Sequence, residues 1–146
     1  MPPFRFRLEQ VLNYRRQLEE EAMQALADAV LQRDAIKKRL QALSAEITEQ
    51  RQRLCRPELF KIGELAMTLE YCGALQRDAE YTRQALAEAE LLVDEKRVVL
   101  IEKSKERGLL DHLKEKQAAR HIQLERQHEQ RVNDETATLR YKPVAL

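Results

Sequence analysis

The feature that most constrains the fold is a row of apolar residues spaced alternately three and four positions apart. Between residues 22 and 54 this row comprises Ala22, Leu26, Ala29, Ile36, Leu40, Leu43, Ile47 and Leu54. Only Arg33 and Gln50 interrupt it. Such spacing places one narrow apolar stripe along a helix, as in a coiled coil. Because a stripe of that width cannot bury itself, the chain has to work through contact between helices.

The composition fits long helices rather than a globule with a large core. Charged residues make up 35% of the chain and aromatic residues 5%, and only three glycines and four prolines interrupt it. Helical periodicity in such a chain indicates long helices. Because their core is a thin layer of Leu, Ile and Ala, we expect no pocket for a small-molecule substrate and no cofactor.

The charge balance limits the partners that the chain can bind. Lys and Arg total 26 against 25 for Asp and Glu, and both signs mix along the whole chain. A nucleic-acid partner usually requires a basic excess, so we expect none. No apolar run approaches the roughly 20 residues of a membrane span, and the opening MPPFRFRLEQ lacks the apolar core of a secretory signal. We therefore expect a cytoplasmic location.

One turn is expected in the body of the chain. The first helix should cover about residues 5–55, because the stripe continues backwards through Ala22, Leu18, Val11 and Leu8. Pro57 should end this helix, since it lacks an N–H group and disfavours a helical residue before it. The segment 56–63 is then the turn.

The second helix is expected over about residues 64–141, before Pro143. Its expected stripe comprises Leu65, Leu69, Cys72, Ala79, Leu86, Ala89, Val93, Leu100, Leu110, Leu113 and Leu124. A turn of about eight residues favours antiparallel neighbours. The predicted fold is all-α: a long antiparallel two-helix coiled-coil hairpin, one domain over residues 1–146, with the second helix the longer.

The far end of the second helix differs in kind from the rest. It should project about 30 residues past the start of the first helix, by the 1.5 Å rise per residue. After Leu113 its stripe positions are polar: Gln117, His121, His128 and Arg131. Two interpretations stay open. The segment is either a solvated tail or a helix that another protein stabilises by surrounding it.

No pattern in the chain indicates catalysis or metal binding. Phosphate-binding glycine loops and nucleophile elbows are absent. The histidines at 112, 121 and 128 lie too far apart for the i, i+4 pair of a helical zinc site. Cys55 and Cys72 flank the turn and are either free thiols or a pair across it. We expect a protein that is not an enzyme and holds no metal.

Both ends of the chain resemble the flagellar export protein FliJ family. The first end reads FRFRLEQVLNYRRQLEEEAMQALADA, similar to the family's aromatic and basic start, Leu-Glu-x-Val-Leu, Arg-rich turn and run of Glu. The second end reads LLDHLKEKQAARHIQLERQHEQRVNDETATLR, where Glu125, Glu129-Gln130-Arg131 and Asp134-Glu135 fit the family's C-terminal series. His121 departs from it, standing where an aromatic residue, most often Tyr, is expected. Residues 27–105 match only as generic coiled coil.

The resemblance implies a stalk-like, non-enzymatic, soluble component of the flagellar type III protein export apparatus. Its shape would be similar to the central stalk of rotary ATPases. Proteins of this family bind the hexameric export ATPase at its central pore, contact the cytoplasmic domain of the membrane-embedded export gate and escort export chaperones. The location implied is cytoplasmic, peripheral on the cytoplasmic face of the inner membrane at the flagellar base.

The resemblance also suggests where two partners bind. The terminal end of the hairpin would bind the ATPase through Arg7, Tyr14, Arg15, Arg16, Lys114, Arg120, His121, Arg126, Glu129, Arg131, Asp134 and Glu135. The turn end has more apolar surface than a hairpin can enclose, and it would bind the export gate through Phe60, Tyr71 and Leu75.

Two other functions stay open on the sequence alone. The chain could be the equivalent stalk of a virulence-type secretion injectisome, which shares the same architecture. It could instead be a scaffold that associates with itself through the stripe of the second helix.

Overall fold

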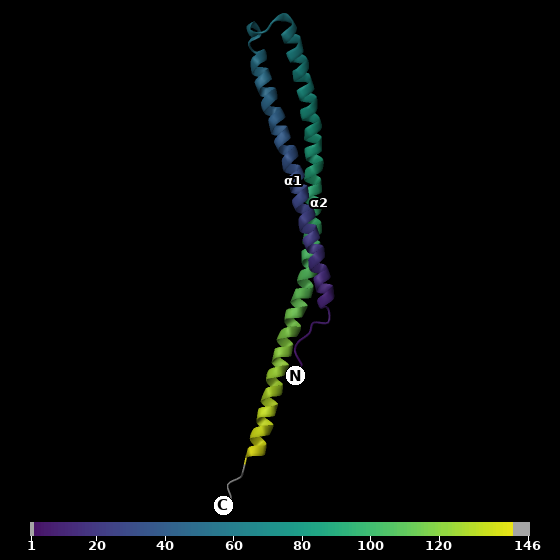
Figure 1. Cartoon of the computed structure of the whole chain (residues 1–146), viewed down its shortest axis with the longest axis vertical. Coiled ribbons are helices and arrows are strands. Elements are labelled where there is room, and N and C mark those ends of the chain that lie inside the picture. Colours follow the sequence, from purple (N-terminus) through teal and green to yellow (C-terminus); the bar gives the residue numbers. More distant parts are fainter. Residues whose placement is uncertain (1, 142–146) are drawn as a thin grey trace, which may run out of the picture. The chain divides into compact units, whose positions relative to one another are not determined.

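The chain folds into two long α-helices joined by a short turn (Figure 1). The computed structural model describes residues 2–141. Helix α1 spans Glu9–Leu54, the 3-10 turn η1 spans Pro57–Leu59, and helix α2 spans Ile62–Arg140. Residues 2–141 contain no strand. The predicted all-α hairpin with a longer second helix is confirmed, while Pro143 lies outside the described residues.

Pro57 and a few local hydrogen bonds define the turn. Pro57 is the first residue of η1, where its missing N–H costs no helical hydrogen bond. The Phe60 N–H donates to the Pro57 carbonyl at 3.1 Å. The Lys61 N–H lies 3.4 Å from a carboxylate oxygen of Glu64, which satisfies one of the free donors at the start of α2. The turn therefore lies where the proline predicted it, within two residues at each side.

The first helix begins later than about residue 5, where the sequence predicted its start. Residues 2–8 are not helical, and α1 begins at Glu9, whose N–H donates to the Phe6 carbonyl at 3.2 Å. The Phe6 side chain is buried, with 7% of its surface exposed. Burial of this ring in a non-helical segment stabilises a conformation that local helix propensity does not predict.

The described residues form two compact units. Within the described residues, unit 1 comprises residues 2–19 and 102–141, and unit 2 comprises Glu20–Ile101. In each unit a segment of α1 pairs with a segment of α2. The single coiled-coil domain expected over residues 1–146 stays a prediction.

The core of unit 2 is a thin apolar layer between antiparallel helices. Ile47 of α1 packs with Leu75 and Ala79 of α2, and Leu40 and Leu43 lie against this cluster. Further buried residues of the unit are Ala22, Ala29, Cys72, Thr82 and Val93. Small Ala and Thr side chains in such a layer leave room for the helices to approach closely. The narrow stripe is therefore buried, as the spacing predicted.

Gln50, which interrupts the apolar row, is itself buried in unit 2. Its amide nitrogen donates to Glu46 at 3.0 Å, and its amide oxygen accepts from Arg53 at 3.4 Å. A buried amide costs free energy unless it is hydrogen-bonded, and both of its ends have partners here.

Two stripe assignments in unit 2 need correction. Leu69 was expected on the buried stripe but is 56% exposed, whereas Leu75 is 7% exposed. The buried positions of α2 run from Cys72 to Leu75, Ala79 and Thr82, in steps of three and four. Leu69 is out of phase with this series because each residue turns the helix by about 100°.

In unit 1 the stripe was also assigned to the wrong residues. Leu8 and Val11 are 38% and 42% exposed, while Leu12 is fully buried. On α2, Leu113 and Leu124 are 37% and 44% exposed. Leu18, Ala22 and Leu26 are spaced four and four residues apart, so the sequence permits more than one alignment of the stripe before them. In the folded chain the packing between the helices buries Leu12.

Burial of Leu75 predicts a large effect of its truncation. Leu75→Ala should lower the free energy of unfolding by about 2–4 kcal/mol, because it removes packed methyl groups and leaves a cavity. Leu69→Ala, on the same helix but exposed, should change it by no more than about 0.5 kcal/mol. Urea unfolding followed by far-UV circular dichroism measures both. Equal effects of the two variants would contradict the assigned core.

Candidate protein-interaction surfaces

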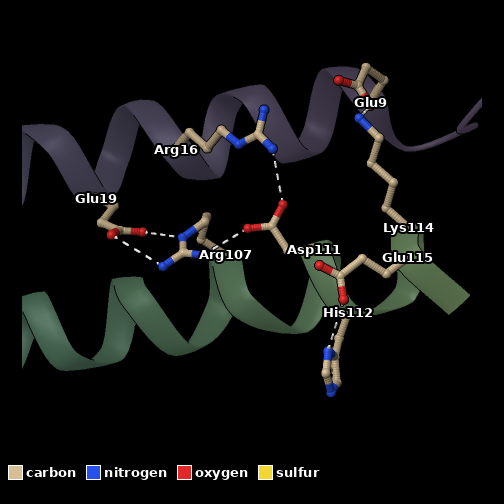
Figure 2. A network of polar contacts seen from close by, with 8 residues as sticks. All are labelled: Glu9, Arg16, Glu19, Arg107, Asp111, His112, Lys114 and Glu115. Atoms are coloured by element: carbon tan, nitrogen blue, oxygen red, sulfur yellow. Dashed lines mark hydrogen bonds and ion pairs between the residues drawn. The ribbon is translucent and has the colours of Figure 1, made fainter.

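Four charged residues join the two helices of unit 1 in a network that we call the polar clasp: Arg16, Glu19, Arg107 and Asp111 (Figure 2). Nε of Arg107 donates to Glu19 at 2.6 Å, and its Nη1 donates to Asp111 at 2.7 Å. Arg16 donates to the other oxygen of Asp111 at 3.0 Å. Each guanidinium faces a carboxylate of the opposite helix, as charge-assisted hydrogen bonds favour.

Two further ion pairs extend the contact between the helices of unit 1. Arg15 donates to Glu106 at 2.7 Å, and Lys114 lies 2.7 Å from Glu9, the first residue of α1. Lys114 and Arg107 stand where apolar residues would continue a coiled-coil stripe. Charged pairs therefore replace apolar packing in this part of unit 1.

Three of the residues predicted to bind the ATPase also make ion pairs within the chain. Arg15, Arg16 and Lys114 each pair with a carboxylate inside unit 1. Their charges are already partly neutralised, so they hold α1 against α2. Arg7 and Tyr14, from the same predicted set, are exposed.

Hydrogen bonds within the polar clasp change the pKa values of two of its members, Asp111 and Arg107. The hydrogen bond from Arg107, with a further one from Arg16, lowers the pKa of Asp111. Hydrogen bonds to Glu19 and then to Asp111 raise the pKa of Arg107, which therefore stays protonated. Arg107 and Asp111 are therefore both charged near neutral pH.

Residues 2–8, which we call the N-terminal segment, lie against α2. The Phe4 and His121 rings meet with their centroids 5.7 Å apart and their planes tilted by 54°. Nε2 of His121 is 3.1 Å from the Pro2 carbonyl oxygen, which can only accept a hydrogen bond. Hence His121, predicted to bind the ATPase, already has contacts within the chain.

Residues 122–140 of α2, which we call the distal segment, are mostly exposed. The exposed charged residues that the sequence predicted for ATPase binding include Arg126, Glu129, Arg131, Asp134 and Glu135, and Arg120 is exposed just before them. Within residues 2–141, the ion pairs along α2 end at His112–Glu115. The threonines at 136 and 138 bond only to carbonyls of their own helix. The predicted side chains are therefore displayed together on one unpaired helix.

At the turn end of unit 2, the three residues predicted to bind the export gate differ in exposure. Phe60 is half-buried, and the Arg53 guanidinium lies 5.4 Å from its ring centroid. Tyr71 is 46% exposed and its hydroxyl donates to Glu46 at 3.3 Å. Partial desolvation and the Glu46 carboxylate raise the pKa of Tyr71, so this hydroxyl stays protonated. Leu75 belongs to the core, which removes it from any surface.

Three exposed apolar residues near the turn were not predicted from the sequence. Leu59, Ile62 and Met67 are 66%, 98% and 71% exposed. We refer to these three residues and Tyr71, which are grouped by their closeness to the turn in the sequence, as the turn patch. These residues do not fit the three-and-four spacing of the stripe, and apolar residues outside that spacing are the sequence signal of an exposed apolar surface.

The described residues offer little for other chemistry. No group of three potential metal-ligating side chains occurs among residues 2–141. Cys55 is exposed and Cys72 is buried, and both are free thiols. In the described part of the chain, neither helix has a stretch apolar enough to cross a membrane. The surfaces that remain as candidates are the distal segment and the turn patch.

Comparison with known proteins gives one match. The family model described as Flagellar FliJ protein matches residues 4–143. No curated protein and no solved structure matches the chain. The match includes both ends and also residues 27–105, which by themselves looked like generic coiled coil.

Acid should loosen the pairing of helices in unit 1. The pKa of Asp111 in the folded protein lies below its ordinary value of 3.8, so its stabilising effect is complete above 3.8 and is lost as the pH falls through the folded value. Spin labels at the exposed Gln10 and Gln117, with Cys55→Ser and Cys72→Ala, should give a narrow distance distribution at neutral pH. The distribution should broaden partially in acid.

Asp111→Asn provides the matched control for the acid response. It removes the titrating carboxylate but keeps the size of the side chain. The labelled variant should be broadened already at neutral pH and should respond less to acid. An unchanged response in this variant would show that the clasp does not cause the effect.

Proposed function

Since this chain belongs to the flagellar FliJ protein family, we propose that it is a stalk that connects the export ATPase to the export gate. Membership makes the protein a non-catalytic component of the flagellar export apparatus. It also agrees with the resemblance at both ends and favours the flagellar system over an injectisome. The two binding surfaces and their partners form the proposal.

The observation that carries ATPase binding is the exposure of the distal segment. Lys114 of α2 lies beside Glu9, where α1 begins, and His121 is the last residue of α2 with a described contact to the N-terminal segment. Beyond it the helix continues to Arg140. A helix that is polar all round is rarely stable alone, because most helical stability in proteins comes from packing. A surrounding ring of protein would supply that packing.

The chemistry of the distal segment suits contacts distributed around a ring. Its acidic and basic side chains alternate, and Ile122, Val132 and Leu139 are exposed between them. An exposed ion pair contributes only about 0–1 kcal/mol. Many moderate contacts, rather than one dominant residue, should therefore hold the segment.

The turn patch supports binding of the cytoplasmic domain of the export gate. Ile62, with 98% of its surface exposed, gains nothing from the fold of this chain, and Leu59 and Met67 lie near it in sequence. Apolar and aromatic side chains are common anchors in protein interfaces. Phe60 and Tyr71, which the sequence predicted for gate binding, lie close to these residues in the sequence.

Two parts of the proposal rest on the family resemblance without assigned residues. They are the escort of export chaperones and a peripheral position on the cytoplasmic face of the inner membrane at the flagellar base.

Deletion of residues 126–146 should abolish binding to the export ATPase and stimulation of its ATP hydrolysis. This deletion keeps the polar clasp and the contact of His121 with the N-terminal segment, so unit 1 should stay folded. Stimulation is measured as phosphate release by the purified hexamer, and folding by circular dichroism. A control deletion of residues 142–146 should keep stimulation. Full stimulation by the longer deletion would refute the proposed role of the distal segment.

Replacement of the turn patch should weaken gate binding without unfolding the protein. Leu59→Ser combined with Ile62→Ser removes exposed apolar surface and no core residue. We expect at least about a tenfold loss of affinity for the cytoplasmic domain of the gate, about 1.4 kcal/mol, in a calorimetric titration. Leu31→Ser, which alters an equally exposed leucine of α1 in unit 2, should leave the affinity unchanged. Equal affinities for all variants would reject the turn patch.

A further inference from the structure

The N-terminal segment covers a face of α2 that lies beyond the point where α1 begins. Helix α1 begins at Glu9 beside Lys114. Farther along α2, Ala118, His121 and Glu125 are only partly exposed, whereas most of their neighbours are exposed. Their spacing of three and four residues puts them on one face of the helix. The N-terminal segment contacts that face at His121 through Phe4 and Pro2.

The contact is small and is not continuous with the helices. It comprises the Phe4–His121 ring pair and the Pro2–His121 hydrogen bond. Phe6 is buried, and the Phe6 and Leu8 carbonyls accept from the Glu9 and Leu12 N–H groups at 3.2 and 2.8 Å, so this part of the segment is anchored to the start of α1. Segments with few buried contacts open locally at low cost. Residues 2–5 can therefore leave α2 while Phe6, the polar clasp and the Lys114–Glu9 pair stay in place.

The covered face borders the proposed ATPase-binding surface. His121 directly precedes the distal segment, and Arg120 and Arg126 lie on either side of it in sequence. A protein ring that encloses α2 from residue 122 onward would meet the Phe4 side chain at the edge of its binding site. Both occupants cannot pack against the same face of a helix.

We propose that residues 2–5 are a detachable strap that covers the His121 face of α2 and has to leave it before the ATPase ring closes around the distal segment. This inference rests on the proposed function of the distal segment. The strap acts as an autoinhibitory contact, because the apparent affinity falls by the fraction of molecules in which the face is open.

Loosening the strap should strengthen ATPase binding. Phe4→Ala removes the ring contact with His121 and keeps the basic residues Arg5 and Arg7. If the strap is closed in most molecules, the variant should bind the hexamer about three- to tenfold more tightly. Affinity is measured by fluorescence anisotropy with the hexamer held in a non-hydrolysable ATP analogue. Arg5→Ala alters an exposed neighbour and should stay within about twofold of the wild type.

Fixing the strap should have the opposite effect. In a background of Cys55→Ser and Cys72→Ala, the variant with Phe4→Cys and His121→Cys can be joined by a bifunctional thiol reagent that a reductant cleaves. The joined protein should bind the hexamer at least about tenfold more weakly than the same sample after cleavage. Circular dichroism before and after cleavage verifies that the helices are unchanged.

The outcomes separate the two proposals. Equal affinity of the joined and cleaved samples, or weaker or unchanged binding by Phe4→Ala, overturns the strap but leaves the effect of deleting residues 126–146 intact. Weaker binding by Phe4→Ala would assign the N-terminal segment to the ATPase interface itself. Failure of the wild-type chain to bind the hexamer overturns both the strap and the proposed function.

Discussion

Burial of a narrow stripe between two helices is the constraint on which the rest of this structure depends. Neither helix has enough apolar surface to fold alone, so each stabilises the other. In unit 2 the shared layer is one side chain deep, with Ile47, Leu75 and Ala79 at its centre. A layer this thin encloses no large cavity. Side chains outside it are therefore exposed and available for partners.

In unit 1, charged pairs join the helices alongside the buried apolar side chains of Phe6 and Leu12. Arg107 bridges Glu19 and Asp111, and Lys114 pairs with Glu9. Such pairs fix the register of two helices, because each one joins a particular residue of α1 to a particular residue of α2, as Glu19 to Arg107 and Glu9 to Lys114. They also depend on salt and acid more than apolar contacts do. A helix pair built this way keeps its helices aligned where there is little apolar core.

The two surfaces that we propose as binding sites lie where the pairing of the helices stops. Beyond His121 the distal segment has no partner helix among the described residues, and at the turn the exposed side chains of Leu59, Ile62 and Met67 fall outside the buried layer. Both surfaces consist of side chains that gain nothing from intramolecular packing. Under the proposed function other proteins bind both surfaces, and the proposed strap at Phe4 would control one of them.

The sequence by itself determined the helices, the turn at Pro57 and the polar character of the distal segment, because spacing, a missing N–H group and residue type act locally. It did not determine which residues face the partner helix. Leu12 is buried rather than Leu8, and Leu75 lies in the core although it was assigned to a binding surface. The sequence also predicted that Arg15, Arg16 and Lys114 bind the ATPase, and in the folded chain each of them pairs with a carboxylate of the opposite helix. Only the tertiary structure decided these points, because the phase of a helix and the partner of a charge depend on residues some 90 to 105 positions away, which local patterns do not encode.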